Sequence, residues 1–528
     1  MFPMLDPAAL DLAELQKLHA LSGEEAKKCA ADWIERLARQ VKFEQTKNQA
    51  LSLELARLKQ WRFGQSSESR DASNQGQLFD TTLEALLIEE SNVEDRAADE
   101  ARKPTPPKKQ AKRQALPSQL QRIEHHYEIE PAVCPQGHPL KRIGQEVSEQ
   151  LDCVPAQFFV HRHIRGKYAC ACCQTVLAAA MPAQIIDKGI PAAGLLAQVI
   201  IAKHDDHLPL YRQEEIYRRS GAHIARSSMA QWIGQCGVRL EPLVQALKKH
   251  LLSQSVIHGD ETPIKLLAPG TGKTRTAYAW VWRSSDLETT DKAVVYQFAD
   301  GRGGQHATAM LQDFHGTLLT DHYAGYKALY AQGKVSEAGC WAHARRKFFE
   351  AHKLNQSPMA QEALQRIGYL YQLESQAQEM SLQDRLQLRQ ARSSPHLQKF
   401  RDWLTQQRPQ LAKADVTARA MDYTLGRWAA LTVYLSDARI PIDNNAVENA
   451  IRPLALGRKN WLFVGSQQAG ERSAVVMSLI ESAKLNGHDA WGYLKDVLTK
   501  LPTWPNSRLH ELLPHRWTLG SKRPANTS

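Results

Sequence analysis

A strand-rich stretch between residues 254 and 321 restricts the fold of this chain more than any other feature of its sequence. Four segments in it have the alternation and the β-branched and aromatic residues of strands. They are Ser255-Val-Ile-His-Gly-Asp260, Thr276-Ala-Tyr-Ala-Trp-Val-Trp282, Ala293-Val-Val-Tyr-Gln-Phe298 and Gly316-Thr-Leu-Leu-Thr-Asp321. A helical segment beginning at Gln305 separates the last two. Three strands, a helix and a further strand are the layout of a ribonuclease-H-like domain, which we expect here within a multidomain α+β protein.

A glycine-rich segment, Pro269-Gly-Thr-Gly-Lys-Thr274, joins the first two predicted strands. It resembles the end of a phosphate-binding loop, but that motif needs a glycine five residues before Gly272, where Leu267 stands. The residues after it alternate like a strand, whereas a phosphate-binding loop opens a helix. We interpret the segment as a hairpin turn and expect no ATP binding.

Two aspartates stand where predicted strands end: Asp260 closes the first apolar run and Asp321 closes the fourth. A carboxylate at the exit of a strand is held by the sheet and faces solvent, which suits metal binding. Ribonuclease-H-like sites take a third carboxylate from a later helix, and Glu448 is the candidate, with Asp443 as its rival. We therefore expect the chemistry to depend on Asp260, Asp321 and Glu448.

Three carboxylates suit a pair of divalent metal ions. Two Mg²⁺ ions about 3.5–4 Å apart stabilise the attacking and leaving oxygens of an in-line displacement at phosphorus, and oxygen ligands suit Mg²⁺. The alternative is structural: Asp260 as a turn residue and Glu448 as the capping-box partner of Asn445. Asn444 or Asn445 is expected to cap the helix that carries Glu448, and Pro453 to end its regular pattern.

Length and charge set wider limits. The chain has 528 residues, which is a prior for about three or four domains. Its net charge of +11 favours a polyanionic partner such as nucleic acid, although only weakly. It has no apolar run long enough to span a membrane and no signal-peptide pattern at its start. Its 8 cysteines are too sparse for a disulfide scaffold, so we expect a cytoplasmic protein.

The N-terminal part predicts a coiled coil over residues 30–62, followed by a flexible basic linker over 63–120. The a positions of a heptad repeat are occupied by Ile34, Val41, Asn48 and Leu55. The d positions are occupied by Leu37, Glu44, Leu51 and Leu58. An asparagine at the first of these positions favours a two-stranded state, so we expect a homodimer. An amphipathic helix packed on its own chain is the alternative. The linker contains prolines and a basic run, 103–113, that either contacts phosphates or is only a solvated tether.

Residues 121–180 have cysteines at metal-binding spacing. Two short knuckles lie about 30 residues apart, and zinc takes four thiolate or imidazole ligands in a tetrahedron. The predicted ligands are Cys134, His138, Cys170 and Cys173, with Cys172 as a substitute. Cys153 lies outside either knuckle and is expected to be packed. Incidental cysteines that bind no metal are the alternative.

Residues 190–253 are helical. Leu210–Arg219, the turn Ser220-Gly221 and Ala225–Trp232 have the pattern of a helix-turn-helix, in which Arg226, Ser227 and Gln231 would face a DNA groove. An ordinary helical hairpin is the alternative.

A basic segment follows Glu448. Arg452, Arg458 and Lys459 are expected to hold phosphates beside the metal ions. They could instead form a solvated basic face, and Arg452 could pair with Glu448 within one helix.

Several motifs together resemble the insertion-sequence sixty-six family of bacterial transposases, which are DDE-type enzymes. His258-Gly-Asp-Glu-Thr-Pro263, Leu319-Thr-Asp-His-Tyr-Ala-Gly-Tyr326 and Pro441-Ile-Asp-Asn-Asn-Ala-Val-Glu-Asn-Ala-Ile-Arg-Pro453 are similar to its catalytic motifs. Further similar segments are 58–68 after the coiled coil, 143–151 and 167–170 in the zinc-binding module, and Ser482-Ala-Lys-Leu-Asn-Gly-His-Asp489. The resemblance covers nearly the whole chain.

The resemblance implies a DNA transposase that cleaves and joins insertion-sequence ends by two-metal phosphoryl transfer with Mg²⁺ or Mn²⁺. Asp260, Asp321 and Glu448 match the family's acidic triad, with Asp260 bridging both ions, and structural Zn²⁺ is implied as well. The catalytic domain would span 254–480, with a helical insertion at about 342–437, before a C-terminal helical segment, 481–528. Small companion proteins of the same element are further expected partners, beside transposon ends and target DNA.

Two departures from the family pattern concern the zinc-binding module. The family usually has two cysteines in the first knuckle, whereas here Cys134 has no partner at Gln136 or Gly137. His138 would have to replace it. Cys153 stands where the family has an aromatic residue, which favours leaving it out of the ligand set.

Cys340-Trp-Ala-His343 resembles a C-x-x-H element of several transposase groups, and a core histidine at His343 is the alternative. Two other functions remain as alternatives to transposition. One is a non-catalytic DNA-binding regulator that uses the coiled coil, the zinc-binding module and the helix-turn-helix alone. The other is a structure-selective nuclease that cuts DNA without joining it.

Overall fold

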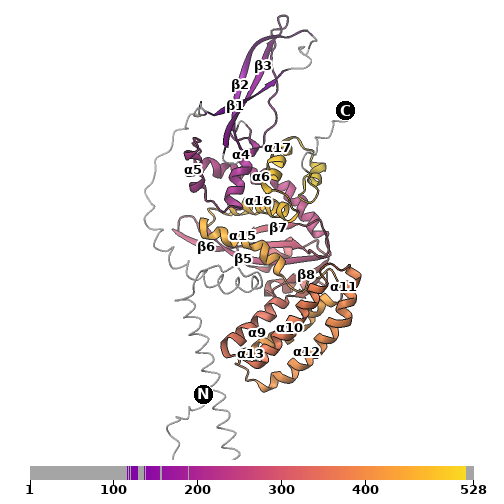
Figure 1. Ribbon diagram of the computed structural model, residues 1–528. Helices are drawn as coiled ribbons and strands as arrows, with labels where there is room; N and C mark the ends of the chain where they lie inside the picture. The colour runs from indigo at the N-terminus through magenta and orange to yellow at the C-terminus, as the bar shows by residue number, and fades with distance from the viewer. Residues whose placement is uncertain are drawn as a thin grey trace, which may run out of the picture. The chain divides into compact units, whose positions relative to one another are not determined.

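The computed structural model describes residues 116, 118, 120–128, 136, 138–154, 157–187 and 189–518 (Figure 1). The predicted coiled coil and nearly all of the predicted linker lie outside these residues. The described chain divides into two compact units. The smaller unit comprises 343–379 and 387–429, and the larger unit comprises the rest of the described chain.

The larger unit begins with a long, narrow sheet. Its strands are β1 (Gln121–Tyr127), β2 (Lys141–Val154), β3 (Gln157–Ala169) and β4 (Val176–Ala178). Strands β2 and β3 form an antiparallel hairpin, β1 lies parallel to β3, and β4 pairs with the end of β3. Near the turn of the hairpin, the Ala192 amide donates to the Leu151 carbonyl at 2.8 Å, which ties the sheet to the helices that follow.

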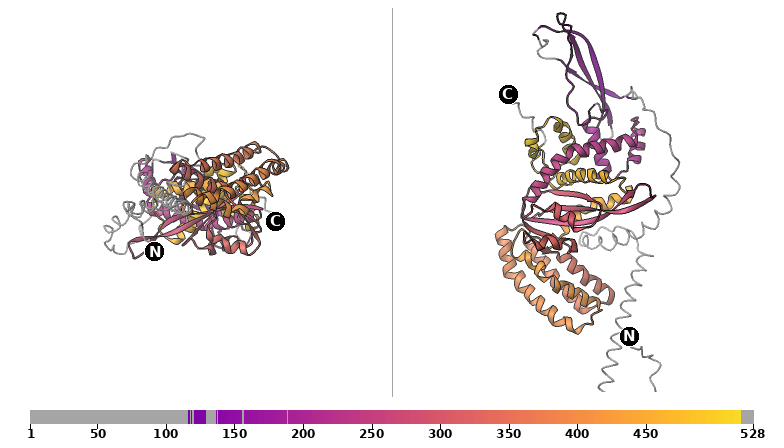
Figure 2. Two further views of the ribbon diagram at one scale, coloured as in Figure 1. Left: turned by 90° about the horizontal axis from the view of Figure 1, so that it is seen from below. Right: turned by 180° about the vertical axis from the view of Figure 1, so that it is seen from behind.

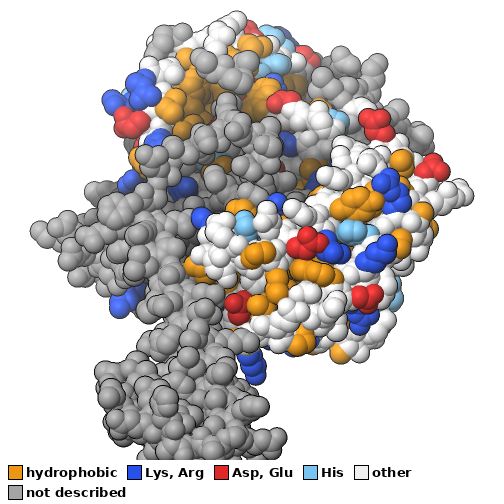
Figure 3. Space-filling model, turned by 60° about the horizontal axis from the view of Figure 1, so that its bottom comes forward, with side chains coloured by type: hydrophobic (Ala, Val, Ile, Leu, Met, Phe, Trp, Pro, Cys, Tyr) orange, Lys and Arg blue, Asp and Glu red, His pale blue; other side chains and the backbone are white. Residues whose placement is uncertain are grey.

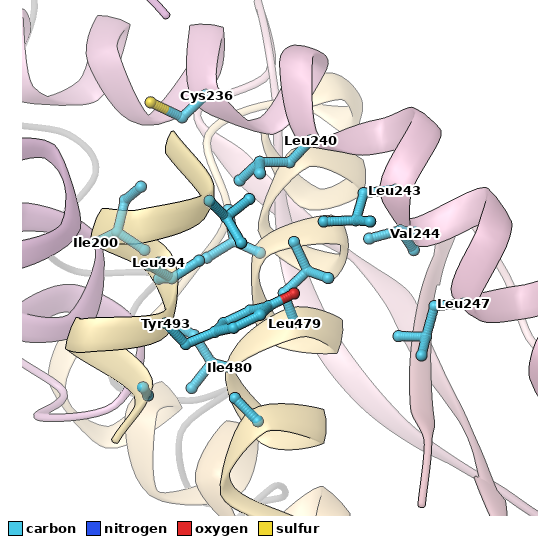
Figure 4. Close-up of a cluster of buried hydrophobic side chains, with 14 of the residues drawn as sticks. Ile200, Cys236, Leu240, Leu243, Val244, Leu247, Leu479, Ile480, Tyr493 and Leu494 are labelled. Carbon is cyan, nitrogen blue, oxygen red and sulfur yellow. The ribbon is translucent and has the colours of Figure 1, made fainter. Parts of the chain in front are cut away.

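Three helices come next: α4 (Ala193–His204), α5 (Leu210–Arg219) and α6 (Arg226–Leu252). Gly221 lies between α5 and α6 with a φ of 83°, a left-handed conformation that glycine adopts without strain. The helix, glycine turn and helix predicted for this region are therefore present. Cys236 and the leucines of α6 pack with Ile200 of α4 and with residues of two C-terminal helices in one buried cluster (Figure 4).

A five-stranded sheet is the centre of the larger unit. Its strands are β5 (Val256–Ala268), β6 (Lys273–Ser284), β7 (Val294–Ala299), β8 (Gly316–Thr320) and β9 (Val335–Gly339). Their order is β7-β6-β5-β8-β9, with β5, β6 and β7 antiparallel and β5, β8 and β9 parallel. The turn between β5 and β6 has Gly270 and Gly272 at positive φ, as the predicted hairpin requires. Strand β9 was not predicted. The β5–β6 hairpin is the long pink pair of strands in the right-hand view of Figure 2.

Helices cover both faces of this sheet. Side chains at alternate positions of its strands therefore pack against helices on one face or the other. Val281 and its neighbours at alternate positions pack against α15 (Asn445–Trp461) and α16 (Gln467–Leu485). Trp280 and Trp282 point to the other face and contact Tyr326, in the turn (Ala324–Tyr326) that precedes α8 (Lys327–Ala331). Helix α7 (Gly304–Met310) packs on this second face as well.

Helix α16 also closes the exposed edge of the sheet. The Tyr296 and Val294 amides of the edge strand β7 each donate to a serine hydroxyl of α16, Ser478 and Ser482, at 2.9 Å. Edge strands otherwise leave such backbone groups unpaired. Helix α17 (Ala490–Lys500) and two 3-10 turns (Leu501–Thr503 and Asn506–Leu512) complete the unit.

Two predicted boundaries change. Pro453 lies inside α15 and does not end it. The predicted boundary between residues 480 and 481 falls within α16, which continues to Leu485.

The smaller unit is helical, as the predicted insertion requires, and its helices lie beside one another (Figure 2). The helices in and around it are α9 (Trp341–Asn355), α10 (Pro358–Gln376), α11 (Leu382–Leu388), α12 (Ser394–Gln407), α13 (Val416–Gly426) and α14 (Trp428–Thr432). The fully buried Arg389 is paired with Glu374 through two contacts of 2.8 and 2.7 Å. Within the described residues, no helix is long and apolar enough to cross a bilayer.

Candidate active site

Asp260 and Asp321 lie where two neighbouring parallel strands separate. Strands β5 and β8 pair from Val256↔Thr317 to His258↔Leu319. Asp260 and Asp321 each follow that last pair by two residues. The backbones are therefore joined just before the two aspartates and free of each other beyond them, which opens space between two carboxylates held by one sheet.

The register of the hairpin sends Asp260 and Glu261 to opposite faces. Asp260 pairs with Val281, whose side chain packs against α15, and Glu261 pairs with Trp280 on the other face. Opposed residues of an antiparallel pair share a face. Asp260 therefore faces α15, which carries Glu448 in its first turn.

Asn444 fixes the start of α15 against β5. Its side-chain oxygen accepts from His258 Nδ1 at 2.8 Å, and its side-chain nitrogen donates to the Gly259 carbonyl at 3.1 Å. Its backbone amide donates to the Cys340 sulfur at 3.2 Å. Asn444 stands at the predicted cap position, but its buried side chain bonds to β5 and does not cap the helix. It ties together the elements that carry Asp260 and Glu448.

The electrostatics of Asp260 reflect this crowding. Its pKa is raised well above the ordinary value, first by burial and then by the negative charges of Asp321, Glu261 and Glu448. One hydrogen bond, from the Glu261 amide at 2.8 Å, favours its charged form. The three neighbouring acids therefore repel a charge on Asp260, and bound cations would relieve that repulsion.

Glu261 already has partners of its own. Arg302 donates to it at 2.7 Å, and the Tyr326 hydroxyl donates at 3.1 Å. The Arg302 guanidinium also lies over the Tyr323 ring, 4.0 Å from its centroid, and the Tyr323 hydroxyl donates to the Arg302 carbonyl. Glu261 therefore belongs to a structural network beside the site.

The three predicted ligands suit divalent cations by their chemistry, because carboxylate oxygens are the ligands that Mg²⁺ prefers. In the described part of the chain, their oxygens do not all come within 4.8 Å of one another.

The predicted zinc ligands are only partly brought together. His138, Cys170 and Cys172 have ligand atoms within 4.8 Å of one another, and His138 Nδ1 lies 3.9 Å from the Cys170 sulfur. The sulfur of Cys173, the expected ligand, instead lies 3.1 Å from the Thr175 hydroxyl, so Cys172 takes its place in this cluster. Cys134 lies outside the described residues.

Cys153 is buried in the hydrophobic core, as expected for a packed residue. Burial, with the neighbouring Asp152 charge, raises the pKa of its thiol to about 12. In the metal-free protein this thiol therefore stays protonated at neutral pH.

The predicted DNA contacts differ in their exposure. Arg226, Ser227 and Gln231 are exposed near the start of α6, and Arg452 and Lys459 are exposed on α15. Arg458 corrects our expectation: it is buried and donates to the Pro263 carbonyl of β5, so it holds α15 on the sheet and does not offer its charge to phosphate. Acidic, basic and apolar side chains are interspersed on the coloured face in Figure 3, so the net charge does not make that face uniformly positive.

Sequence reasoning missed the partners that orient the carboxylates. His258, Glu261, Tyr323 and Tyr326 occur in motifs that the sequence singled out, but nothing in those motifs assigned them a role. Arg302, in a short glycine-rich loop, gave no signal. A buried asparagine just before the acidic helix, Asn444, was interpreted only as a cap.

The comparisons with protein families agree along the chain. The model described as "Transposase IS66 family" matches residues 188–472, and the "IS66 C-terminal element" matches 478–515. The "zinc-finger binding domain of transposase IS66" matches 131–174, and "Transposase C of IS166 homeodomain" matches 50–124.

Three similar proteins come from Sinorhizobium fredii (strain NBRC 101917 / NGR234), and all are named only as uncharacterized. The protein y4qI is 37% identical over 414 residues, covering 76% of this chain and 77% of the relative. The protein y4jD is 36% identical over 415 residues, covering 76% and 81%. The protein y4hP is 32% identical over 415 residues, covering 74% and 75%.

Proposed function

Because the chain belongs to the transposase IS66 family, which implies DNA transposition, we propose that Asp260, Asp321 and Glu448 catalyse metal-dependent cleavage and strand transfer at insertion-sequence ends. One observation carries this assignment. The pKa of Asp260 is raised by burial and then by the charges of Asp321, Glu261 and Glu448, which supports a shared site for one carboxylate on β5, one just after β8 and one on α15.

The sheet supports a ribonuclease-H-like core. Three antiparallel strands, a helix and two parallel strands in the order β7-β6-β5-β8-β9 put the first strand at the centre, with Asp260 on it. The second aspartate follows the adjacent strand β8, and Glu448 comes from a helix packed on the same sheet. The helical insertion enters between β9 and α15.

The protein residues have separate roles in this proposal. Two Mg²⁺ or Mn²⁺ ions, when bound, would supply stabilisation of the attacking and leaving oxygens. Asp260 would hold both, and Asp321 and Glu448 one each. Asn444 keeps the helix of Glu448 against the strand of Asp260, and Arg302 balances the charge of Glu261, so that this fourth carboxylate does not compete for the ions.

DNA would be held by several parts of the chain. Arg226, Ser227 and Gln231 are exposed at the second helix of the helix-turn-helix and would contact a groove. Arg452 and Lys459, exposed on α15, would contact phosphates near the carboxylates. A structural Zn²⁺ would be held by His138 and Cys170 with Cys172 or Cys173, and by Cys134. The predicted coiled coil over 30–62 would pair two protomers, each on one transposon end.

The test is cleavage and joining of terminal-repeat DNA with Mg²⁺, together with any companion proteins of the same element. We expect the native protein to give nicked and joined products, and Asp260→Asn to bind the same DNA without producing either. Asp313→Asn, which removes an exposed carboxylate outside the site, is the matched control and should retain both products.

The outcome also separates the alternatives. Equal product from Asp260→Asn and native protein would refute the proposal and favour a DNA-binding regulator. Products that are cut but never joined would indicate a nuclease.

A further inference from the structure

A cavity of about 130 Å³ lies along α15, apart from the carboxylates. We call it the α15 cavity. Its walls come from α4, the sheet, α15 and α16, and the residues that matter for its chemistry are Lys203, His204, Tyr296, Phe298, Trp461 and Phe463. Aromatic rings therefore form much of its lining, and two nitrogen-bearing side chains from the end of α4 share it.

Those two side chains have no partners in the described structure. His204 is 9% exposed, and its Nε2 atom is buried without a hydrogen bond to any described residue. Burial lowers the pKa of His204 well below its usual value and also lowers the pKa of Lys203. Within the described ranges, no hydrogen bond or ion pair joins the Lys203 ammonium to another residue. Buried polar groups normally find partners, so the buried His204 nitrogen, with the half-buried Lys203 beside it, points to a ligand with hydrogen-bonding atoms.

The cavity opens beside exposed apolar side chains. Phe463 lines it and is still 41% exposed, and its neighbour Leu462 is 46% exposed. Leu462 has a φ of 58°, a left-handed conformation that is strained for leucine. Val464, two residues after Leu462, is fixed to the sheet, because its amide donates to the Lys265 carbonyl at 2.8 Å. Two apolar side chains are thus held outward at the opening.

Cations lie at the same end of α15. Arg212 of α5 donates to the Asn460 side chain at 3.3 Å, next to Trp461, and Lys459 is exposed. Glu448 and Trp461 are 461 − 448 = 13 residues apart on one helix, which is roughly 20 Å at 1.5 Å per residue. At the duplex rise of about 3.4 Å per nucleotide, this separation corresponds to about six nucleotides, and to fewer in an extended single strand.

We propose that the α15 cavity binds one pyrimidine base from an unpaired stretch of the DNA strand that runs along α15. A dry cavity of about 150 Å³ is known to accept benzene, so the α15 cavity, at about 130 Å³, is on the scale of one six-membered ring and not of the two rings of a purine. Aromatic side chains stack on such a base, and Lys203 and His204 meet its edge, where both pyrimidines carry a carbonyl oxygen. The inference rests on DNA as the partner and does not require cleavage.

The experiment compares two short single strands of equal length without divalent metal: oligothymidylate and the same backbone lacking bases. Both carry the same phosphates, so their difference reports the bases alone. We expect the full-length protein to bind oligothymidylate roughly tenfold more tightly than the abasic strand. Oligodeoxyadenylate should show a smaller preference.

Three variants locate the effect. Lys203→Met, and Ser473→Leu, which fills the cavity and keeps the charge, should each reduce the preference to less than about threefold. Lys249→Met removes the same charge from an exposed position on α6 and should leave the preference unchanged.

Equal binding of both strands by native protein, or an unchanged preference in folded Lys203→Met and Ser473→Leu, would overturn the inference. Because no cleavage is scored, its failure is distinct from failure of the proposed transposase chemistry.

Discussion

At the scale of single residues, a charge on Asp260 lowers the folding stability of the metal-free protein. Its raised folded-state pKa means that the folded protein holds this proton more strongly than the unfolded chain does. The contribution of Asp260 to stability is therefore full below the ordinary pKa of about 4 and is lost as pH rises through the folded-state value. In the metal-free protein, ionisation of Asp260 therefore lowers the stability of the fold.

Asp260→Asn should consequently raise the melting temperature of metal-free protein at pH 7, by about 2–4 °C, because a neutral amide is repelled by none of the three neighbouring acids. Addition of Mg²⁺ should raise the melting temperature of the native protein more than that of the variant. Differential scanning fluorimetry with EDTA and with Mg²⁺ measures both effects. A variant that melts below native protein in EDTA would contradict this account of the site.

Asn444 is a second residue whose effect can be predicted. Asn444→Ala removes an acceptor from His258 and a donor from the Gly259 carbonyl, and both groups are buried. Unsatisfied buried groups cost about 1–3 kcal/mol each, so denaturant unfolding should show a loss on that order. Asn444→Asp keeps the acceptor and should recover part of the stability. A loss below about 0.5 kcal/mol in Asn444→Ala would be inconsistent with the bridging role.

At the scale of elements, Cys170 belongs both to the ligand set predicted for the zinc-binding module and to the cluster that the structure brings together. Cys170→Ser should reduce the zinc content of purified protein from about one ion to near zero. Cys153→Ser, which changes a buried thiol of the core, should retain the ion. Comparison of Cys172→Ser with Cys173→Ser then identifies the remaining ligand. Retention of zinc by Cys170→Ser would exclude this module as the binding site.

Elements and site residues differ in how far the sequence predicts them. The strand alternation around Trp280, the turn at Gly270 and the grouping of Asp260 with Asp321 follow from local pattern. Strand β9 is short and its pairing is non-local, so no local signal reveals it. The role of Arg302 depends on a tertiary contact with Glu261, which no spacing encodes.

Pro453 shows why a helix boundary failed. The rule that proline ends a helix rests on its missing amide hydrogen and its clash with the preceding turn. Here α15 continues, because its residues on both sides of Pro453 pack on the sheet. The Tyr296 hydroxyl of β7 also donates to the Ala450 carbonyl at 2.5 Å, in the turn that the proline disrupts. Tertiary packing outweighs the local preference.

At the scale of the whole molecule, three histidines make the fold sensitive to acid. Burial and neighbouring groups lower the pKa values of His163, His258 and His515 to about 4. Each is neutral in the folded protein and takes up a proton on unfolding between pH 6.5 and about 4. The pH dependence of stability that these histidines cause is opposite to that caused by Asp260, because stability is lost as pH falls through this window.

We therefore expect the free energy of unfolding to fall on acidification from pH 7 to pH 5, by about 1.4 kcal/mol per pH unit for each fully responding histidine. Asp260→Asn should lose more than native protein, because it lacks the carboxyl group that gains stability in acid. Urea unfolding at both pH values measures this difference. If the stability of Asp260→Asn did not change between pH 7 and pH 5, these histidines would have ordinary pKa values in the folded protein.

The junction at which the helical insertion leaves and rejoins the larger unit has a consequence for evolution. The Trp341 amide donates to the Ile442 carbonyl at 3.1 Å, and the Asn444 amide donates to the Cys340 sulfur, so the segments on either side of the insertion are already joined. The intervening 100 or so residues form a closed loop whose entropic cost grows only with the logarithm of its length. Such a junction tolerates exchange: an insertion could lengthen, shrink or be replaced by another domain while the strand of Asp260 and the helix of Glu448 keep their alignment.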